Sequence, residues 1–509
     1  MSIKIKSKLR SDLSTSNFYK EFILKNRHRI VSFHLPVIEC TTEFFPPFTF
    51  DSAFIRLESI IINLTEPKIL TLILKNLTCL PRLFSLTIDI LKILEHLNDI
   101  YRLIFALSTL KYNKVIVHFK ESSITLPIAT DEEFGCIESL IIDHSCSSNE
   151  LISLISYTPR LRHLTVCKTD NNDTNAQIFS LRNLINLESI YLDMFQITFH
   201  TLAIFLCKLS SNLKILSIAS SNDINFLNAH LWENLISINF PQLEKFYLTY
   251  SDRFLNDNQY EVYHVQVNEF SSLFWIKRKW IFDVEIRFIN IEYIVHPYNK
   301  RWYDDTDEIN VNYSIEPCKL TGLTFGHMAD FTFEGYMFKK IQRILTITQI
   351  FYLNILENHI LTSVLIKLLD ELPDLIVLAM HSLSFDKTKD SSVRTYDDIY
   401  SMRDKSKIKK VYIQEINNKK DFDFLCTFCP HMKYFKVKHI NSMSIQLFLQ
   451  VILKKISDDE NIDVRALCFH MPLADDQIIQ NLKTFITREQ LLAQFTISRT
   501  FDHIYLRWD

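Results

Sequence analysis

The sequence is nearly free of glycine. Only Gly135, Gly322, Gly326 and Gly335 occur in 509 residues, whereas about 7% of an average protein is glycine. Their spacing forms neither GxGxxG nor GxxxxGK[ST], the two loops in which bare backbone holds a phosphate group. The sequence therefore excludes nucleotide-binding enzymes of those two classes.

The chain also lacks an excess of charge of one sign and a long apolar run. The chain has 56 Lys and Arg against 59 Asp and Glu, a net charge of -3, so nothing electrostatic favours a dedicated nucleic-acid binder. The richest apolar stretch, 83–110, is interrupted by charges such as Asp89 and Arg102, so we expect no membrane span. The N-terminus has no apolar run of signal-peptide length. We therefore expect reduced cysteines and a cytosolic location, or a nuclear one.

Catalytic motifs are absent as well. No GxSxG, HExxH or DFG-type constellation occurs in the sequence, and these are the common signatures of serine hydrolases, zinc proteases and kinases. The sequence gives no reason to expect an enzyme, a cofactor or a metal.

What is present is a repeat. A hexapeptide with apolar residues at positions one, four and six recurs at intervals of 26, 29, 25, 24, 26, 26 and 30 residues. Its copies are LESIII from Leu57, LFSLTI from Leu83, YNKVIV from Tyr112, IESLII from Ile137, LRHLTV from Leu161, LESIYL from Leu187, LKILSI from Leu213 and LEKFYL from Leu243. Leucine-rich repeats have this LxxLxL strand motif at a period of about 20–29 residues.

Similar units precede and follow that block with wider spacing. They are HRIVSF from His28, IFDVEI from Ile281, LTGLTF from Leu320, ITQIFY from Ile347, LIVLAM from Leu375, IKKVYI from Ile408, MKYFKV from Met432, VRALCF from Val464 and FDHIYL from Phe501. Between the hexapeptides the apolar period changes from two to 3.6, which predicts a helix after each strand. Prolines such as Pro159 and Pro241 stop these helices before the next strand.

These patterns predict an α/β leucine-rich-repeat solenoid shaped like a horseshoe. Its parallel strands would line the concave face and its helices the convex face. We divide the chain into a basic N-terminal segment with a partial helix (1–27), regular repeats (28–250), an aromatic and basic insertion (251–318) and degenerate repeats (319–509).

Two features of the repeats resemble a known family. The units with Cys-Pro or Thr-Pro before the hexapeptide, at Cys429 and Thr158, and the opening NFYKEFILKNRHRIVSFHL are similar to F-box/leucine-rich-repeat proteins. The resemblance implies a protein substrate held on the repeat surface, and an F-box that recruits a small adaptor and a cullin-type ubiquitin ligase. The residues ahead of His28 do not follow the F-box pattern. A ligase adaptor is therefore an expected partner only if an F-box stands upstream of Met1; the alternative is a stand-alone scaffold or inhibitor.

Position nine of the repeat also departs from the family pattern. The usual Asn or Cys, which satisfies backbone groups in the turn after the strand, is replaced by Thr65, Leu91, Ser145, Thr169, Phe195 and Ser221. We therefore expect the turns to satisfy their backbone groups in another way.

The candidate binding surface follows from strand geometry. Alternate side chains of a strand leave opposite faces, so positions two, three, five and seven would face the concave surface. The residues that we assign to partner binding are Glu138, Ser139, Asp143, Arg162, His163, Glu188, Tyr191, Asp193, Lys214 and Tyr247. Tyrosine among charged groups suits protein recognition. The alternative is a sheet face that only contacts water.

Three further candidates have a plainer alternative that we favour. Trp275, Trp280 and Trp302 alternate with bases in the insertion and could stack on single-stranded nucleic acid, or pack against the solenoid. Cys426 and Cys429, with His431 and His439 nearby, could form half of a zinc site or a redox pair, or be core cysteines. The basic start, from Lys4 to Arg29, could be a localisation signal or a solvated end.

Overall fold

The structure is a computed structural model of the chain. It describes residues 2–4, 21–38, 50–64, 67–91, 97–119, 123–169, 183–194, 197–209, 212–221, 223–253, 269–287, 290–299, 321–326, 334–385, 406–441, 443–459, 462–472 and 474–508. The chain divides into two compact units, Met1–Tyr250 (unit 1) and Ser251–Asp509 (unit 2).

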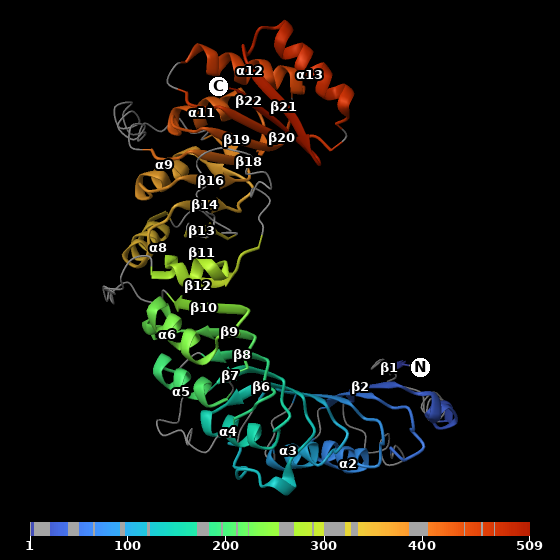
Figure 1. Cartoon of the computed structure of the whole chain (residues 1–509). Helices are drawn as coiled ribbons and strands as arrows, with labels where there is room; N and C mark the ends of the chain where they lie inside the picture. Colours follow the sequence, from blue (N-terminus) through green and yellow to red (C-terminus); the bar gives the residue numbers. More distant parts are fainter. Residues whose placement is uncertain are drawn as a thin grey trace. The chain divides into compact units, whose positions relative to one another are not determined.

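Unit 1 is built on a parallel sheet (Figure 1). Its strands are β1 (Ser2–Lys4), β2 (Ser32–Ile38), β3 (Ser59–Leu64), β4 (Ser85–Ile90), β5 (Tyr112–Val117), β6 (Ser139–Cys146), β7 (His163–Thr169), β8 (Ser189–Met194), β9 (Ile215–Ser220) and β10 (Lys245–Arg253). Each strand pairs in parallel with the next strand in the sequence. Sequence neighbours are therefore neighbours in the sheet.

The helices of unit 1 follow the strands. They are η1 (Arg27–Arg29), α2 (Pro67–Leu77), α3 (Leu97–Phe105), η2 (Asp131–Glu133), α4 (Ser148–Ser156), α5 (Phe199–Leu209), η4 (Ile224–Leu227) and α6 (Ala229–Asn239). In Figure 1 the helices α2 to α6 all lie along the same side of the sheet. We call the opposite side of this sheet the open face of unit 1.

The apolar triplets of the hexapeptides form the core between the sheet and the helices. Along β4 and β9, buried and half-buried residues alternate strictly, as they do in a strand with one covered face. In β4 the buried residues are Leu86, Ile88 and Ile90, and Leu86 and Ile88 are the fourth and sixth positions of their hexapeptide. The repeat thus places one apolar row of every strand under the helices.

The structure corrects the register of one repeat. Tyr112 pairs with Ser85 on one side and with Ser139 on the other, and both serines hold the third position of their units. The unit therefore begins at Leu110 and not at Tyr112. The reason for the error is Asn113, which occupies the fourth, buried position and interrupts the apolar pattern that defines the repeat.

Replacing Asn113 with leucine is expected to stabilise unit 1. Its neighbours in the same row are Leu86 and Leu140, and all three side chains are fully buried. The Asn113 amide makes one hydrogen bond, from Nδ2 to the Leu86 carbonyl oxygen at 3.3 Å. Asn113→Leu should therefore raise the free energy of unfolding by about 1–2 kcal/mol, measured by urea denaturation. A lower free energy of unfolding would show that the hydrogen bond outweighs the burial.

Unit 2 has the same alternation of strands and helices (Figure 1). Its strands are β11 (Trp280–Ile286), β12 (Asn290–Pro297), β13 (Gly322–Phe325), β14 (Tyr352–Ile355), β15 (Ile360–Leu361), β16 (Val377–Met380), β17 (Leu383–Ser384), β18 (Lys410–Ile416), β19 (Tyr434–Ile440), β20 (Ala466–His470), β21 (Phe495–Thr500) and β22 (His503–Trp508). Its helices are η5 (Glu269–Ser271), α7 (Leu273–Arg278), α8 (Glu334–Ile347), α9 (Thr362–Glu371), α11 (Lys419–Phe428), α12 (Ile445–Asp458) and α13 (Asp476–Arg488).

The sheet of unit 2 is parallel in its middle and antiparallel at two places. The strands β11, β13, β14, β16, β18, β19 and β20 pair in parallel in that order. β12 pairs antiparallel with β11, and β22 pairs antiparallel with both β20 and β21. The expectation of a parallel strand is therefore wrong for the last hexapeptide, at 501–506. Only a short turn joins β21 to β22, and a parallel pair needs a much longer crossover.

The second face of the unit 2 sheet is buried across β14, β16 and β18, unlike the open face of unit 1. Leu353 and Leu378 lie on one face, yet their neighbours Tyr352, Val377 and Ala379 on the other face are also buried. With Tyr412 of β18 these three form an apolar cluster. The sequence shows a sign of this at 375–380, where LIVLAM is apolar at all six positions, as in a strand that is buried on both faces.

The prediction of an α/β chain is confirmed: large, mostly parallel β-structure alternates with helices in both units. None of the described helices is long and apolar enough to cross a membrane.

Candidate protein-binding surface

The ten residues assigned to partner binding lie in or directly before β6 to β10. The second-position residues, Glu138, Arg162, Glu188 and Lys214, precede their strands and form a row along the amino-terminal edge. The others lie within the strands. Because the strands are in register over positions three to six, each row there continues from one repeat to the next. Beyond position six the pairing of β6 with β7 shifts, between Ile142 and Ser145.

The charged row is internally paired. Arg162 contacts Glu188 at 2.6 Å, Lys214 contacts the same carboxylate at 3.6 Å, and Lys111 contacts Glu138 at 2.9 Å. The hydrogen bond from Arg162 holds the pKa of the Glu188 carboxyl below its ordinary value, and Lys111 does the same for Glu138. These charges lie at the surface, where such pairs contribute little to stability. They align adjacent repeats and largely neutralise one another.

The next row contains hydroxyl groups and a histidine. Ser139, His163 and Ser189 lie side by side on β6, β7 and β8. The Nδ1 atom of His163 is 2.7 Å from the Ser189 hydroxyl oxygen, a hydrogen bond between neighbouring repeats. These three side chains are polar, and the row continues into Tyr112 on one side and Ile215 on the other.

Two tyrosines stand out on the open face. Tyr191 of β8 and Tyr247 of β10 both pair with Ser217 of β9, so a small side chain separates them. Strand spacing places their Cα atoms about 10 Å apart. Tyr191 is 43% exposed and Tyr247 38%. The arrangement is a shallow gap between two aromatic walls, wide enough for one side chain of a partner.

Carboxylates gather at the other end of the same strands. Asp143 and Asp193 hold position seven of β6 and β8, and Asp89 holds it on β4, where it contacts His118 at 3.1 Å. Asp193 pairs with Ala219 beside the tyrosine gap. Burial, with a smaller effect of the Asp193 charge, raises the pKa of Tyr191. The carboxyl-terminal edge of the open face is therefore acidic and suits a basic partner segment.

The aromatic residues of the insertion are core residues where they are described. Trp275 and Trp280 are fully buried, with ring centroids 5.9 Å apart. The Arg278 guanidinium lies over the Phe274 ring at 4.0 Å. Neither tryptophan presents a ring face to a nucleic-acid base, which supports the packing interpretation. Trp302 lies outside the described residues, as do residues 5–20 of the basic start.

The two cysteines of the CxxC motif are also buried. Cys426 and Cys429 lie at the end of α11, and burial raises the pKa of the Cys426 thiol to about 12 and that of Cys429 further. Their neighbour His431 contacts Asp463 at 3.3 Å instead. Within the described parts of the chain, no three His, Cys, Asp or Glu side chains are grouped so that they could hold one metal ion. The motif is part of the core.

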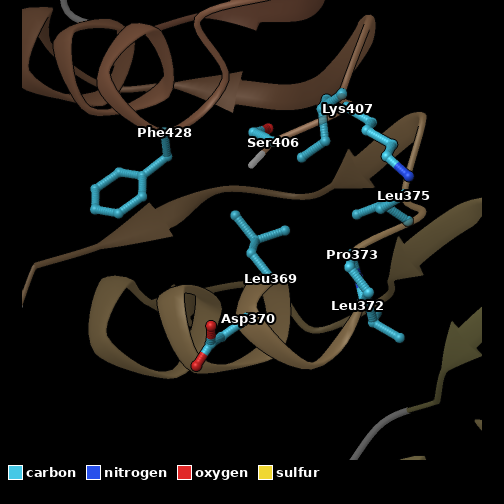
Figure 2. Close-up of a pocket in the computed structure, with 9 residues that line it drawn as sticks. Leu369, Asp370, Leu372, Pro373, Leu375, Ser406, Lys407 and Phe428 are labelled. Carbon is cyan, nitrogen blue, oxygen red and sulfur yellow. The ribbon is translucent and has the colours of Figure 1, made fainter. Parts of the chain in front are cut away.

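A small cavity near that core lies between α9 and α11. It has a volume of about 50 Å³, enough for one or two water molecules. Figure 2 shows Leu369 of α9 facing this space, Asp370 pointing away from it and Phe428 on the neighbouring helix. Lys407 at its edge contacts Asp374 at 2.7 Å. The cavity is too small for an organic ligand and reflects imperfect packing between two repeats.

Sequence reasoning missed a row of histidines in unit 2. His381 directly follows β16, and His470 is the last residue of β20. His439 lies near the end of β19. A signal was present: histidine comes directly after the apolar triplet in LIVLAMH and VRALCFH. An alignment of the repeats with one another would have shown it.

Comparisons with known proteins do not place the chain in a family. No protein-family model matches the sequence, and no curated protein matches it at a significant level.

Proposed function

We propose that the chain is a leucine-rich-repeat solenoid that binds another protein on the open face of unit 1. The observation that carries this proposal is the exposed tyrosine pair, Tyr191 and Tyr247, which stand on the open face on either side of the small Ser217. The role resembles the substrate-recognition part of an F-box ubiquitin ligase. The proposed activity is binding, without catalysis, in the cytosol or nucleus.

The architecture supports the solenoid. Strands recur roughly once per repeat, pair with the next repeat in register, and are followed by helices on one side (Figure 1). In such proteins helices occupy more width than strands, so that stacking bends the array and the strands line its concave side. The open face would then be the inner surface of a horseshoe.

The side chains of this face support a protein partner. Tyrosine gives a large rigid contact area and a hydroxyl for hydrogen bonding, and it is enriched among the residues that dominate binding energy. The paired charges at the amino-terminal edge form a polar rim. The aspartates Asp143 and Asp193 favour a segment with lysine or arginine, whose cation can lie over a tyrosine ring while it pairs with a carboxylate.

Loss of both tyrosines should weaken partner binding. The Tyr191→Ala, Tyr247→Ala double variant is expected to retain about 10- to 100-fold less of the partner in affinity capture from native extract, followed by quantitative mass spectrometry. Both rings are exposed, so the midpoint of thermal unfolding should change little. The matched control is Ile238→Ala, which removes a 76% exposed apolar side chain from α6. Equal retention by the double variant and the control would contradict the proposal.

The ligase role and the scaffold alternative differ in one partner. If the protein is part of a ubiquitin ligase, it should co-purify with a small F-box adaptor and a cullin. If it is a stand-alone scaffold, it should not. Both share the open face, so the tyrosine experiment tests binding independently of this choice.

A further inference from the structure

A groove of about 550 Å³ lies at the carboxyl-terminal ends of β18, β19 and β20 in unit 2. Its polar lining includes Glu415, Lys438, His439, Asn441 and His470. The volume is within the range of small-ligand sites. None of these residues belongs to the surface assigned to partner binding in unit 1, so the groove is a separate site.

Two histidines, His439 and His470, line this groove, and His503 of β22 lies beside His470. The ring centroids of His439 and His470 are 5.8 Å apart, and those of His470 and His503 are 5.2 Å apart. His470 and His503 lie directly opposite each other in the antiparallel pair of β20 and β22. Imidazoles so close to one another disfavour simultaneous protonation, unless an anion lies against them.

Charges of both signs lie around His470. Lys436, Lys438 and His439 of the neighbouring strand β19 lie near His470. Asp502, in the turn before β22, is the negative charge near it. Burial lowers the pKa of His470, and the charges of β19 lower it further. Among the described lining residues, Glu415 alone carries a carboxylate, and its Oε2 atom accepts a hydrogen bond from Asn441 at 3.2 Å. When both histidines are protonated, the described lining carries three positive groups, Lys438, His439 and His470, against the one carboxylate of Glu415. An anionic ligand is therefore favoured in mildly acidic solution.

We propose that this groove binds an acidic peptide segment of a partner protein, and that it binds the segment more tightly in mildly acidic solution than at neutral pH. A carboxylate that lies against both His439 and His470 stabilises their protonated forms, so that binding takes up protons. By linkage, affinity rises as the pH falls, until the carboxylates of the peptide themselves protonate near pH 4.3. The site does not depend on the proposed function of unit 1.

The test uses the full chain and a fluorescent hexaglutamate peptide, with hexaglutamine as the neutral control. Fluorescence anisotropy at low ionic strength is expected to give a Kd about tenfold lower at pH 5.5 than at pH 7.5, and no binding of hexaglutamine. The net charge of the whole chain is -3 at pH 7, where its 17 histidines are counted as neutral. At pH 5.5 most histidines are protonated and the chain becomes positive, so the double histidine variant described next also measures the unspecific attraction of a polyanion at that pH. The His439→Gln, His470→Gln variant should lose the pH dependence, and His431→Gln, a histidine of unit 2 beside Asp463, should keep it.

A variant that is expected to bind more tightly shows that the loss of binding in other variants is not caused by misfolding. Glu415→Gln removes the repelling carboxylate and keeps an oxygen for Asn441, so it should bind hexaglutamate several-fold more tightly at both pH values. An unfolded variant cannot produce this result. The proposal is overturned if hexaglutamine binds as well as hexaglutamate, if affinity does not change with pH, or if the double histidine variant behaves like the wild type. The tyrosine variant of unit 1 should bind hexaglutamate normally, which separates this proposal from the proposed function.

Discussion

The Trp232→Ala variant is expected to lose about 3–5 kcal/mol of the free energy of unfolding of unit 1. Trp232 lies on α6 and is fully buried. Its ring contacts Phe199 of α5 and Phe246 of β10, each at a centroid distance of 4.9 Å. Its indole nitrogen donates a hydrogen bond to the Phe226 carbonyl oxygen at 2.8 Å. The side chain thus joins two successive repeats, and its removal leaves a cavity between them.

Hydrogen exchange with mass spectrometry measures this effect in each unit separately. In Trp232→Ala, peptides from 199–250 should exchange at least 100-fold faster, while peptides from 410–470 in unit 2 should not change. Tyr247→Ala is the matched control, because Tyr247 follows Phe246 on the same strand but points to the open face. Equal acceleration in Tyr247→Ala would contradict the assignment of the two faces of β10.

The strands were predictable because each repeat must bury the same apolar row. Leu86 and Leu140 keep that row apolar, and period-two burial in a strand leaves a pattern that a sequence displays directly. At Asn113 this pattern is interrupted. A single polar residue in the buried row shifted the assigned register by two residues, and only the pairing of Tyr112 with Ser85 corrected it.

The positions of the candidate site residues on the strands could be predicted from the sequence, but the ion pairs between them could not. Position two of each hexapeptide is at the edge of the sheet, so Arg162, Glu188 and Lys214 could be placed in one row from sequence. That Arg162 and Lys214 share one carboxylate depends on rotamers and on the distance between strands, which the sequence does not contain. The exposure of Tyr191 likewise depends on the small Ser217 beside it.

The final hairpin of unit 2 was not predictable. A tight turn between antiparallel strands usually has glycine or asparagine where φ is positive, and this turn has Phe501 at φ 51. Arg499 donates from Nε to the Phe501 carbonyl oxygen at 2.8 Å, which holds the turn by a side-chain contact. Nothing in the local sequence distinguishes this segment from another parallel strand.

The missing asparagine of position nine has a structural replacement. Acidic side chains reach from one repeat to backbone N–H groups of the previous one. One oxygen of Asp223 accepts from the Phe199 amide of the previous repeat at 2.7 Å, and the other accepts from the Asn225 amide in its own turn at 3.0 Å. The sequence indicated that other groups must satisfy the backbone of the turns. It did not indicate which residues do so, because these carboxylates lie at different positions of each repeat.

Glu150 is the most deeply buried example in unit 1. It lies on α4 and is 4% exposed. One carboxylate oxygen accepts from the Ile124 amide, in the previous repeat, and the other accepts from the Ser147 amide at 2.7 Å. The Ser147 hydroxyl in turn accepts from the Glu150 amide, which completes the cap of α4. One side chain therefore satisfies groups in two repeats.

Replacing Glu150 with alanine should lower the free energy of unfolding by about 2–4 kcal/mol, because two poorly hydrated N–H groups lose their acceptors. Glu150→Gln keeps one oxygen acceptor and should lose roughly half as much. Urea denaturation measures both values, and hydrogen exchange at Ile124 and Ser147 assigns the loss to these amides. If the Ile124 amide stays protected in Glu150→Ala, the link between the repeats is made by other groups. If it loses protection, side chains such as Glu150 perform the task that asparagine performs in regular leucine-rich repeats.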